Sequence, residues 1–103
     1  MWVSWPKPVF KFKNTKGVEY EVYFMKPHKA QGEDLHGLCI NPNENNPKIY
    51  INRGLTKKTE LNTIIHEICH AFFWDKSEKE VTKFANTVTA MLYKQGWRKN
   101  KDD

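Results

Sequence analysis

Apolar and polar residues alternate through the first quarter of the chain. In VFKFK (9–13) and in VEYEVYFM (18–25), an apolar side chain occupies every second position. This period of two is typical of strands that bury one face. The segment between them, NTKG (14–17), has the composition of a turn, with Gly17 free to adopt a positive φ. The two strands are therefore expected to form a hairpin.

Two shorter strand-like segments follow, LHGLCIN (35–41) and KIYIN (48–52), on either side of the turn-rich NPNENNP. The stretch KPHKAQGED (26–34) is polar and contains Pro27 and Gly32, so it is expected to be a loop. The pattern thus predicts a small antiparallel sheet of three to four strands.

The second half of the chain has helical periodicity. Thr56 is a suitable N-cap for a helix that runs to about Trp74. The tetrapeptide SEKE (77–80) fits a capping box and opens a second helix, for which Gly96 is a good stop. The apolar residues of this second helix recur at helical spacing and are Val81, Phe84, Ala85, Val88, Met91 and Leu92. Strands followed by helices indicate an α+β fold, with a small antiparallel sheet and then two packed helices.

The motif HEICH (66–70) interrupts the apolar run of the first helix. At about 100° per residue, His66 and His70 lie about 40° apart and share one face, one turn apart. Glu67 falls at the edge of this histidine face. The residues expected to face the core are centred on nearly the opposite side and are Leu61, Ile64, Ile65, Ile68, Cys69 and Phe72.

Two imidazoles at positions i and i+4 of a helix can bind one tetrahedral Zn²⁺ at about 2.0–2.1 Å. The glutamate beside the first histidine cannot easily reach the same ion, but it can hydrogen-bond a water molecule held there. The metal lowers the pKa of that water, Glu67 takes its proton, and the hydroxide attacks a carbonyl group. The motif therefore predicts a metal site, with Zn²⁺ as cofactor, in preference to two packed or solvated histidines.

A third protein ligand is expected, because two histidines alone hold zinc weakly. His28 and His36 lie upstream and are candidates. Glu78 and Glu80 open the second helix at opposite edges of its apolar stripe, so periodicity alone does not choose between them. Glu80 has a structural alternative, which is to close the capping box with Ser77. The structural alternative for Glu78 is a favourable charge at a helix N-terminus.

The composition is that of a globular chain, because 39% of its 103 residues are hydrophobic and 14% are aromatic. The length suits a single domain over residues 1–103. Apolar runs are far shorter than the roughly 20 residues that span a bilayer, and the N-terminus lacks the pattern of a secretory signal. Cys39 and Cys69 are expected to be buried free thiols, with a disulfide between them as the alternative. Cytoplasm is therefore the expected location.

The net charge is +5, with lysines spread along the chain. Such a surface could attract nucleic acid, but no basic stripe or nucleic-acid motif accompanies it, so a solvated lysine-rich surface is the preferred interpretation. The tryptophans are predicted to be packing residues, because they are not interleaved with a basic stretch. They are Trp2, Trp5, Trp74 and Trp97.

The stretch LNTIIHEICHAFFWDKSEKEVTKFANTVTAMLYKQGWR resembles small phage-encoded HExxH metallopeptidase-like proteins. It also resembles, more distantly, the catalytic cores of the SprT-like and ImmA/IrrE families. The resemblance covers roughly residues 35 to 98 and implies a minimal zincin-like core. In that core the helix after the motif carries an E-x-x-V pattern, which here runs from Glu78 to Val81.

The resemblance implies a role for each site residue. His66 and His70 would be metal ligands, Glu78 the third ligand, and Glu67 the catalytic acid and base. KIYIN (48–52) would form the sheet edge beside the cleft, where an extended peptide substrate can add as a strand. No histidine follows His70, which departs from the SprT pattern, and the chain is too short for the separate DNA-binding or sensor region of ImmA/IrrE proteins.

The predicted function is zinc-dependent hydrolysis of peptide bonds in a peptide or protein substrate. The rival is a non-enzymatic phage accessory protein, in which zinc ties the two helices together and another surface binds a host or virion factor. Glu67 favours the enzyme, because a structural zinc site needs no general base and typically fills all four positions with Cys or His. The candidates for stabilising an oxyanion are His36, Tyr50, Tyr93 and Arg98.

Overall fold

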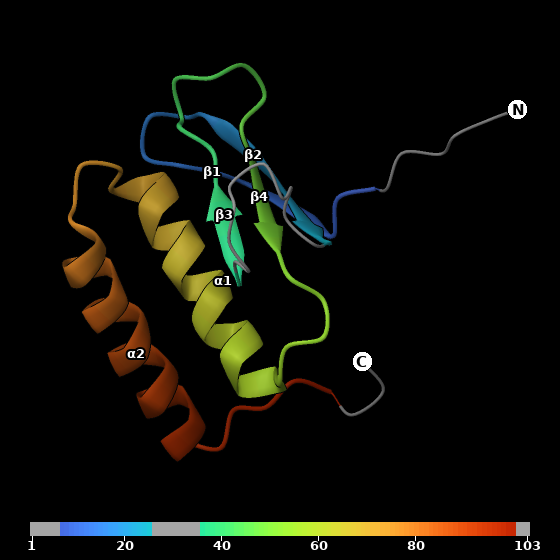
Figure 1. Cartoon of the computed structure of the whole chain (residues 1–103), viewed down its shortest axis with the longest axis vertical. Helices are drawn as coiled ribbons and strands as arrows, with labels where there is room; N and C mark the ends of the chain where they lie inside the picture. Colours follow the sequence, from blue (N-terminus) through green and yellow to red (C-terminus); the bar gives the residue numbers. More distant parts are fainter. Residues whose placement is uncertain (1–6, 26–35, 101–103) are drawn as a thin grey trace, which may run out of the picture.

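The computed structural model describes residues 7–25 and 36–100 of the chain. Four strands are followed by two helices (Figure 1), which confirms the α+β fold class. The elements are β1 (Phe10–Lys13), β2 (Glu19–Phe24), β3 (Gly37–Cys39), β4 (Lys48–Ile51), α1 (Lys57–Phe72) and α2 (Glu78–Lys94). The loop predicted at 26–34 lies outside the described residues, and His28 lies there with it.

The strands form one sheet in the order β1-β2-β4-β3. The pairs β1–β2 and β3–β4 are antiparallel, but β2 and β4 are parallel. The sheet is therefore mixed, which corrects the prediction that all its strands are antiparallel. A period of two determines which face of a strand is buried, but it carries no information about the direction of the neighbouring strand.

The strand order also corrects the expected sheet edge. KIYIN corresponds to β4, which lies inside the sheet between β2 and β3. The edge strands are β1 and the short strand β3, and α1 packs beside β3. Any extended peptide that adds to the sheet beside α1 therefore meets β3 and not β4.

The core lies between the sheet and α1. Tyr20 and Val22 from β2 and Ile49 and Ile51 from β4 are fully buried, as the alternation predicts. Burying each such side chain contributes about 1.5–3 kcal/mol. Ile64 and Ile68 of α1 pack against this cluster, as predicted, although both are only half-buried. The buried positions of α1 are Thr63, Glu67 and Ala71, which the sequence pattern did not single out as core-facing.

Helix α2 packs on the side of α1 that faces away from the sheet (Figure 1). The predicted caps are confirmed: Thr56 accepts a hydrogen bond from the Thr59 N–H, and Ser77 and Glu80 form a capping box. Among the described elements, α2 packs against α1, so part of its apolar stripe stays exposed. Phe84 and Met91, which belong to the predicted apolar stripe, are both exposed. Neither described helix combines the length and apolarity needed to cross a membrane.

Candidate functional site

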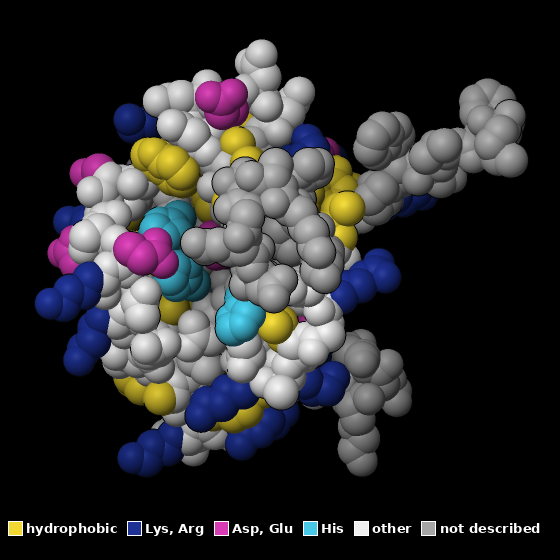
Figure 2. Space-filling view, in the orientation of Figure 1, with side chains coloured by type: hydrophobic (Ala, Val, Ile, Leu, Met, Phe, Trp, Pro, Cys, Tyr) yellow, Lys and Arg dark blue, Asp and Glu magenta, His cyan; other side chains and the backbone are white. Residues whose placement is uncertain are grey.

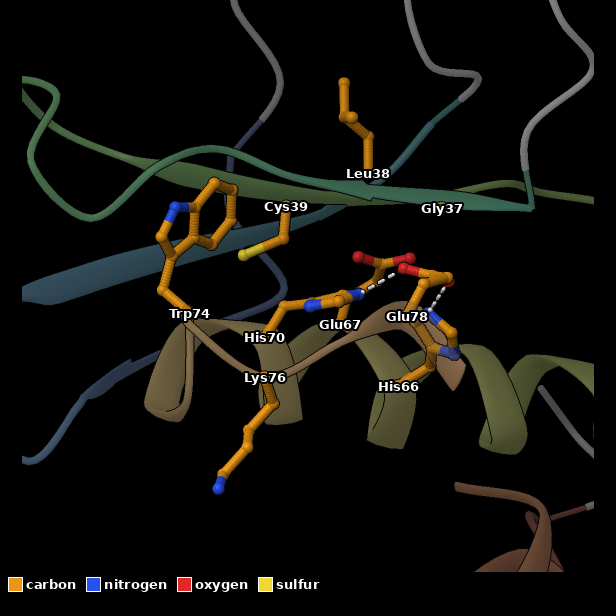
Figure 3. A pocket seen from close by; sticks show the side chains of 9 residues that line it. All are labelled: Gly37, Leu38, Cys39, His66, Glu67, His70, Trp74, Lys76 and Glu78. Atoms are coloured by element: carbon orange, nitrogen blue, oxygen red, sulfur yellow. Dashed lines mark hydrogen bonds and ion pairs between the residues drawn. The ribbon is translucent and has the colours of Figure 1, made fainter. Parts of the chain in front are cut away.

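His66 and His70 project from successive turns of α1 toward the first turn of α2 (Figure 3). The Nε2 atom of His66 lies 2.7 Å from Glu78 Oε2, and the Nε2 atom of His70 lies 2.9 Å from Glu78 Oε1. One ligand atom from each of the three residues lies within 4.8 Å of the others, so they form a group that could hold a metal ion. Histidine and acidic side chains adjoin at the surface in Figure 2, and the side chain of Glu78 is 70% exposed, so the group is open to solvent.

The turn between the helices determines which carboxylate joins this group. Ser77 is the N-cap of α2, and Glu78 is its first helical residue, beside the last turns of α1. Glu80 turns back instead: its Oε1 accepts a hydrogen bond from the Ser77 N–H at 3.2 Å, and its own N–H donates to Ser77 Oγ at 3.1 Å. The two carboxylates that periodicity could not separate therefore have different partners.

The donor set fits a divalent transition metal. Two imidazole nitrogens and one carboxylate oxygen are ligands that zinc accepts, and three protein ligands leave a fourth position open. Ligand atoms around a tetrahedral ion at about 2.0–2.1 Å lie about 3.4 Å apart, so the carboxylate needs to withdraw by about half an ångström. The side chain of Glu78 is 70% exposed and can make this adjustment without disturbing the core.

Glu67 lies between the histidines and the sheet (Figure 3), at the edge of the histidine face, where the helical period places it. Its side chain is 7% exposed and packs against Gly37 of β3. Burial, with a smaller contribution from the Glu78 charge, raises the pKa of Glu67 to about 8. A bound cation opposes this shift because it stabilises the carboxylate. A buried carboxyl group with a pKa near neutrality, facing a cleft, suits proton transfer.

Gly37 sets the distance between the sheet edge and α1, although the sequence analysis did not identify it. A Cβ at this position would lie 2.7 Å from Thr63 Cγ2 and 3.0 Å from both Glu67 Cγ and the Tyr50 carbonyl oxygen. Any side chain here would push α1 or Glu67 away. The available signal was a glycine inside a strand pattern, which often marks a close backbone approach.

An open cleft of about 550 Å³ between β3 and α1 contains the three ligand residues and Glu67. Cys39 and Trp74 also line this cleft, and His36 lines a smaller adjoining hollow of about 300 Å³. Burial raises the pKa of the Cys39 thiol to about 12, so this thiol is neutral and is a poor metal ligand. Cys39 and Cys69 are both free, as predicted.

The described tryptophans depart from the prediction that they are packing residues. Trp74 is 42% exposed and Trp97 is 64% exposed, whereas Trp2 and Trp5 lie outside the described residues. Trp74 follows the end of α1 at a position where no periodic pattern specifies the direction of its side chain. No sequence pattern therefore indicated that it lines the cleft.

The four candidates for oxyanion stabilisation are dispersed in the structure. His36 lines the hollow beside His66 and Glu67. Tyr50 stacks on Tyr23 on the sheet face away from α1. Tyr93 and Arg98 contact each other in a groove at the opposite end of the helices. His36 is therefore the candidate that the structure brings to the site.

The fold and the site together define a small α+β domain with a candidate metal group of the HExxH type. Comparison with protein-family profiles matches residues 20–94 to the peptidase family described as the IrrE N-terminal-like domain. The chain belongs to this family, because the match covers most of its length, including β2 to β4 and both helices. Comparison with curated proteins and with solved structures found no significant match.

Proposed function

We propose that this chain is a zinc-dependent metallopeptidase that hydrolyses peptide bonds, with His66, His70 and Glu78 as zinc ligands. The convergence of these three donors beside the buried carboxyl group of Glu67 is the observation that carries the proposal. Membership of a peptidase family supports it. Among the described residues three donors converge and leave a fourth ligand position open. This also supports the proposal, since a structural zinc site is closed by four protein ligands.

When bound, zinc would supply a Lewis acid that polarises a carbonyl group and lowers the pKa of water. Glu67, which follows His66 in the chain and faces the same cleft, would accept a proton there and pass it to the leaving amine. Gly37 packs closely against the Glu67 side chain and limits its movement toward β3. His36 would be available to hydrogen-bond the developing oxyanion from the adjoining hollow.

The edge of β3 supports an extended peptide as the substrate. The Asn52 N–H donates to the His36 carbonyl at 2.7 Å, and the Ile40 N–H donates to the Lys48 carbonyl at 3.0 Å. In an antiparallel pair these bonded positions alternate, so the backbone groups of Gly37 and Cys39 point away from β4. A peptide can pair with these groups as an added strand and lie along the cleft.

A cytoplasmic location forms part of the proposal, in the host cell if the chain is phage-encoded as the resemblance implies. The free thiols of Cys39 and Cys69 support a reducing compartment. They lie on different elements, with Cys39 in β3 and Cys69 in α1.

The test combines metal content with cleavage of casein and of the chain itself, for wild type and for Glu67→Gln. We expect one zinc ion per chain in both proteins and cleavage by the wild type alone. Glu60→Gln is a matched control, because Glu60 lies near the other end of α1 in an ion pair with Lys99, and it should retain both properties. Zinc retained without cleavage by any protein, over a broad substrate set, would favour the non-enzymatic rival.

A further inference from the structure

The two ends of the cleft differ in chemistry. At the His70 end, the wall includes Trp74 and the neutral thiol of Cys39; Lys76 also lines this end, but its ammonium group points away from them (Figure 3). The ring centroid of Trp74 lies 6.2 Å from that of His70, and the indole is 42% exposed. At the His66 end, the wall is polar. The polar residues there are His36, Asn62 and Thr63.

Trp74 is one of three consecutive aromatic residues that point in different directions. Phe72 stacks on Phe12 at 5.8 Å, at the edge of the core. Phe73 lines a separate hollow together with Phe84 of α2. Trp74 instead lines the cleft that holds the ligand residues. Its neighbour Phe73 therefore provides a matched aromatic position outside the cleft.

The direction of β3 relates these two ends to the direction of a bound peptide. β3 runs from Gly37, which lines the hollow at the His66 end, to Cys39, which lies beside Trp74 (Figure 3). Antiparallel pairing is slightly more stable per residue than parallel pairing, so a peptide on this edge is expected to run the opposite way. Its residues on the N-terminal side of the cleaved bond then lie at the Trp74 end.

We propose that Trp74 and Cys39 form a specificity pocket for an apolar side chain on the N-terminal side of the cleaved bond. This inference rests on the proposed function and adds its substrate preference. An apolar side chain gains free energy when it leaves water for contact with an indole and a neutral thiol. A polar or charged side chain would lose hydration there without a hydrogen-bond partner of its own.

The test measures binding to the zinc-loaded protein, so it does not depend on turnover. Three hydroxamates, which chelate zinc, serve as probes. Acetyl-leucine hydroxamate carries an isobutyl group on the N-terminal side of the chelating group, acetyl-glycine hydroxamate lacks it, and an isobutylsuccinyl hydroxamate carries it on the C-terminal side. We expect the leucine probe to bind about tenfold more tightly than the glycine probe, as partial burial of four carbon atoms implies.

Variants assign this preference to the pocket. In Trp74→Ala the leucine-to-glycine affinity ratio should fall to about one, whereas Phe73→Ala should retain the wild-type ratio. Trp74→Phe, which keeps an apolar ring, should retain most of the preference, and Trp74→Gln should lose it. The comparison of Trp74→Phe with Trp74→Gln still tests the pocket if Trp74→Ala folds poorly.

Equal affinity of the wild type for the leucine and glycine probes would overturn the pocket, as would a leucine preference that survives in Trp74→Ala. Tighter binding of the isobutylsuccinyl probe would overturn the assigned side, and failure to bind any probe would overturn the inference as a whole. A protein that binds the leucine probe through Trp74 but cleaves no peptide supports the pocket and contradicts the proposed function. A protein that cleaves peptides but shows no preference between the leucine and glycine probes supports the proposed function and contradicts the pocket.

Discussion

Glu78 and Glu80 show how two identical side chains, two residues apart, acquire different tasks. Glu78 contacts both imidazoles, whereas Glu80 closes the capping box. We expect Glu78→Ala to weaken zinc binding by about a hundredfold or more, because a ligand is lost. Glu80→Ala should retain zinc affinity and lower the melting temperature, because the N-terminus of α2 loses a cap. Competition with a chromophoric chelator measures the affinities, and the reverse outcome would identify Glu80 as the ligand.

Glu67 makes the stability of the metal-free protein dependent on pH. Burial raises its pKa from the ordinary value of 4.5 to about 8 in the folded state. Between these values the folded chain binds a proton that the unfolded chain has lost, so stability falls as pH rises from about 4.5 to about 8. Glu67→Gln removes this titration. We expect the variant to be more stable than wild type at pH 8–9 by an amount on the order of a few kcal/mol.

Urea unfolding of both proteins in the presence of a chelator, at pH 5, 7 and 9, measures this difference. The two proteins should have similar stability at pH 5, and the gap should widen toward pH 9. All other titrating groups are common to both proteins, so the difference isolates Glu67. If the unfolding free energies of the two proteins changed with pH in parallel, ionisation of Glu67 would not destabilise the folded state, and the prediction would be wrong.

At the scale of elements, the close contact of β3 with α1 depends on Gly37. A Cβ at this position would meet Thr63 Cγ2, Glu67 Cγ and a backbone oxygen at 2.7–3.0 Å. Gly37→Ala should therefore destabilise the fold by about 1–3 kcal/mol and should reduce peptide cleavage by displacing Glu67. Adding Thr63→Ser removes the nearest contact and should restore part of the lost stability. Thermal unfolding and cleavage assays check both effects, and an unchanged Gly37→Ala protein would mean that the two elements can separate freely.

The positions of the strands and helices along the chain could be predicted, whereas the pairing and order of the strands in the sheet could not. A period of two located β1 and β2, the turn-rich stretch NPNENNP located β3 and β4 on either side of it, and the S-x-x-E pattern at Ser77 located the start of α2. The parallel β2–β4 pair and the edge position of β3 depend on contacts between segments distant in sequence, which a local pattern does not contain. The burial of Glu67 was not predicted, because periodicity assumes that buried positions are apolar, an assumption that often fails at functional sites.

The site was predictable to the extent that local geometry determines it. The i, i+4 spacing alone placed His66 and His70 on one face of α1. The choice of Glu78 required the family resemblance, because Glu78 and Glu80 lie at equivalent edges of the apolar stripe. Trp74 and Gly37 act through the tertiary packing of β3 against α1. A glycine inside a strand pattern indicates a close backbone approach, but no local pattern identifies α1 as the element approached or Trp74 as a residue of the cleft.

At the scale of the whole molecule, the group of His66, His70 and Glu78 connects two helices that differ in how much of the fold packs against them. Helix α1 packs against both the sheet and α2, whereas the neighbour of α2 among the described elements is α1 (Figure 1). Two ligands come from α1 and the third from the first turn of α2. A bound ion would therefore fasten the outermost helix at the end where the chain enters it.

Metal removal should accordingly affect α2 more than the sheet. At free zinc about a thousandfold above the dissociation constant, binding adds about 4 kcal/mol to the stability of the folded state. For a chain of this size, that corresponds to a rise in melting temperature of roughly 15 °C over the chelated protein. Amide hydrogen exchange should slow most in the first turns of α2, because local opening there breaks the ligand group. Glu78→Ala should abolish both effects and Glu80→Ala should keep them, whereas protection spread evenly over sheet and helices would place the ion elsewhere.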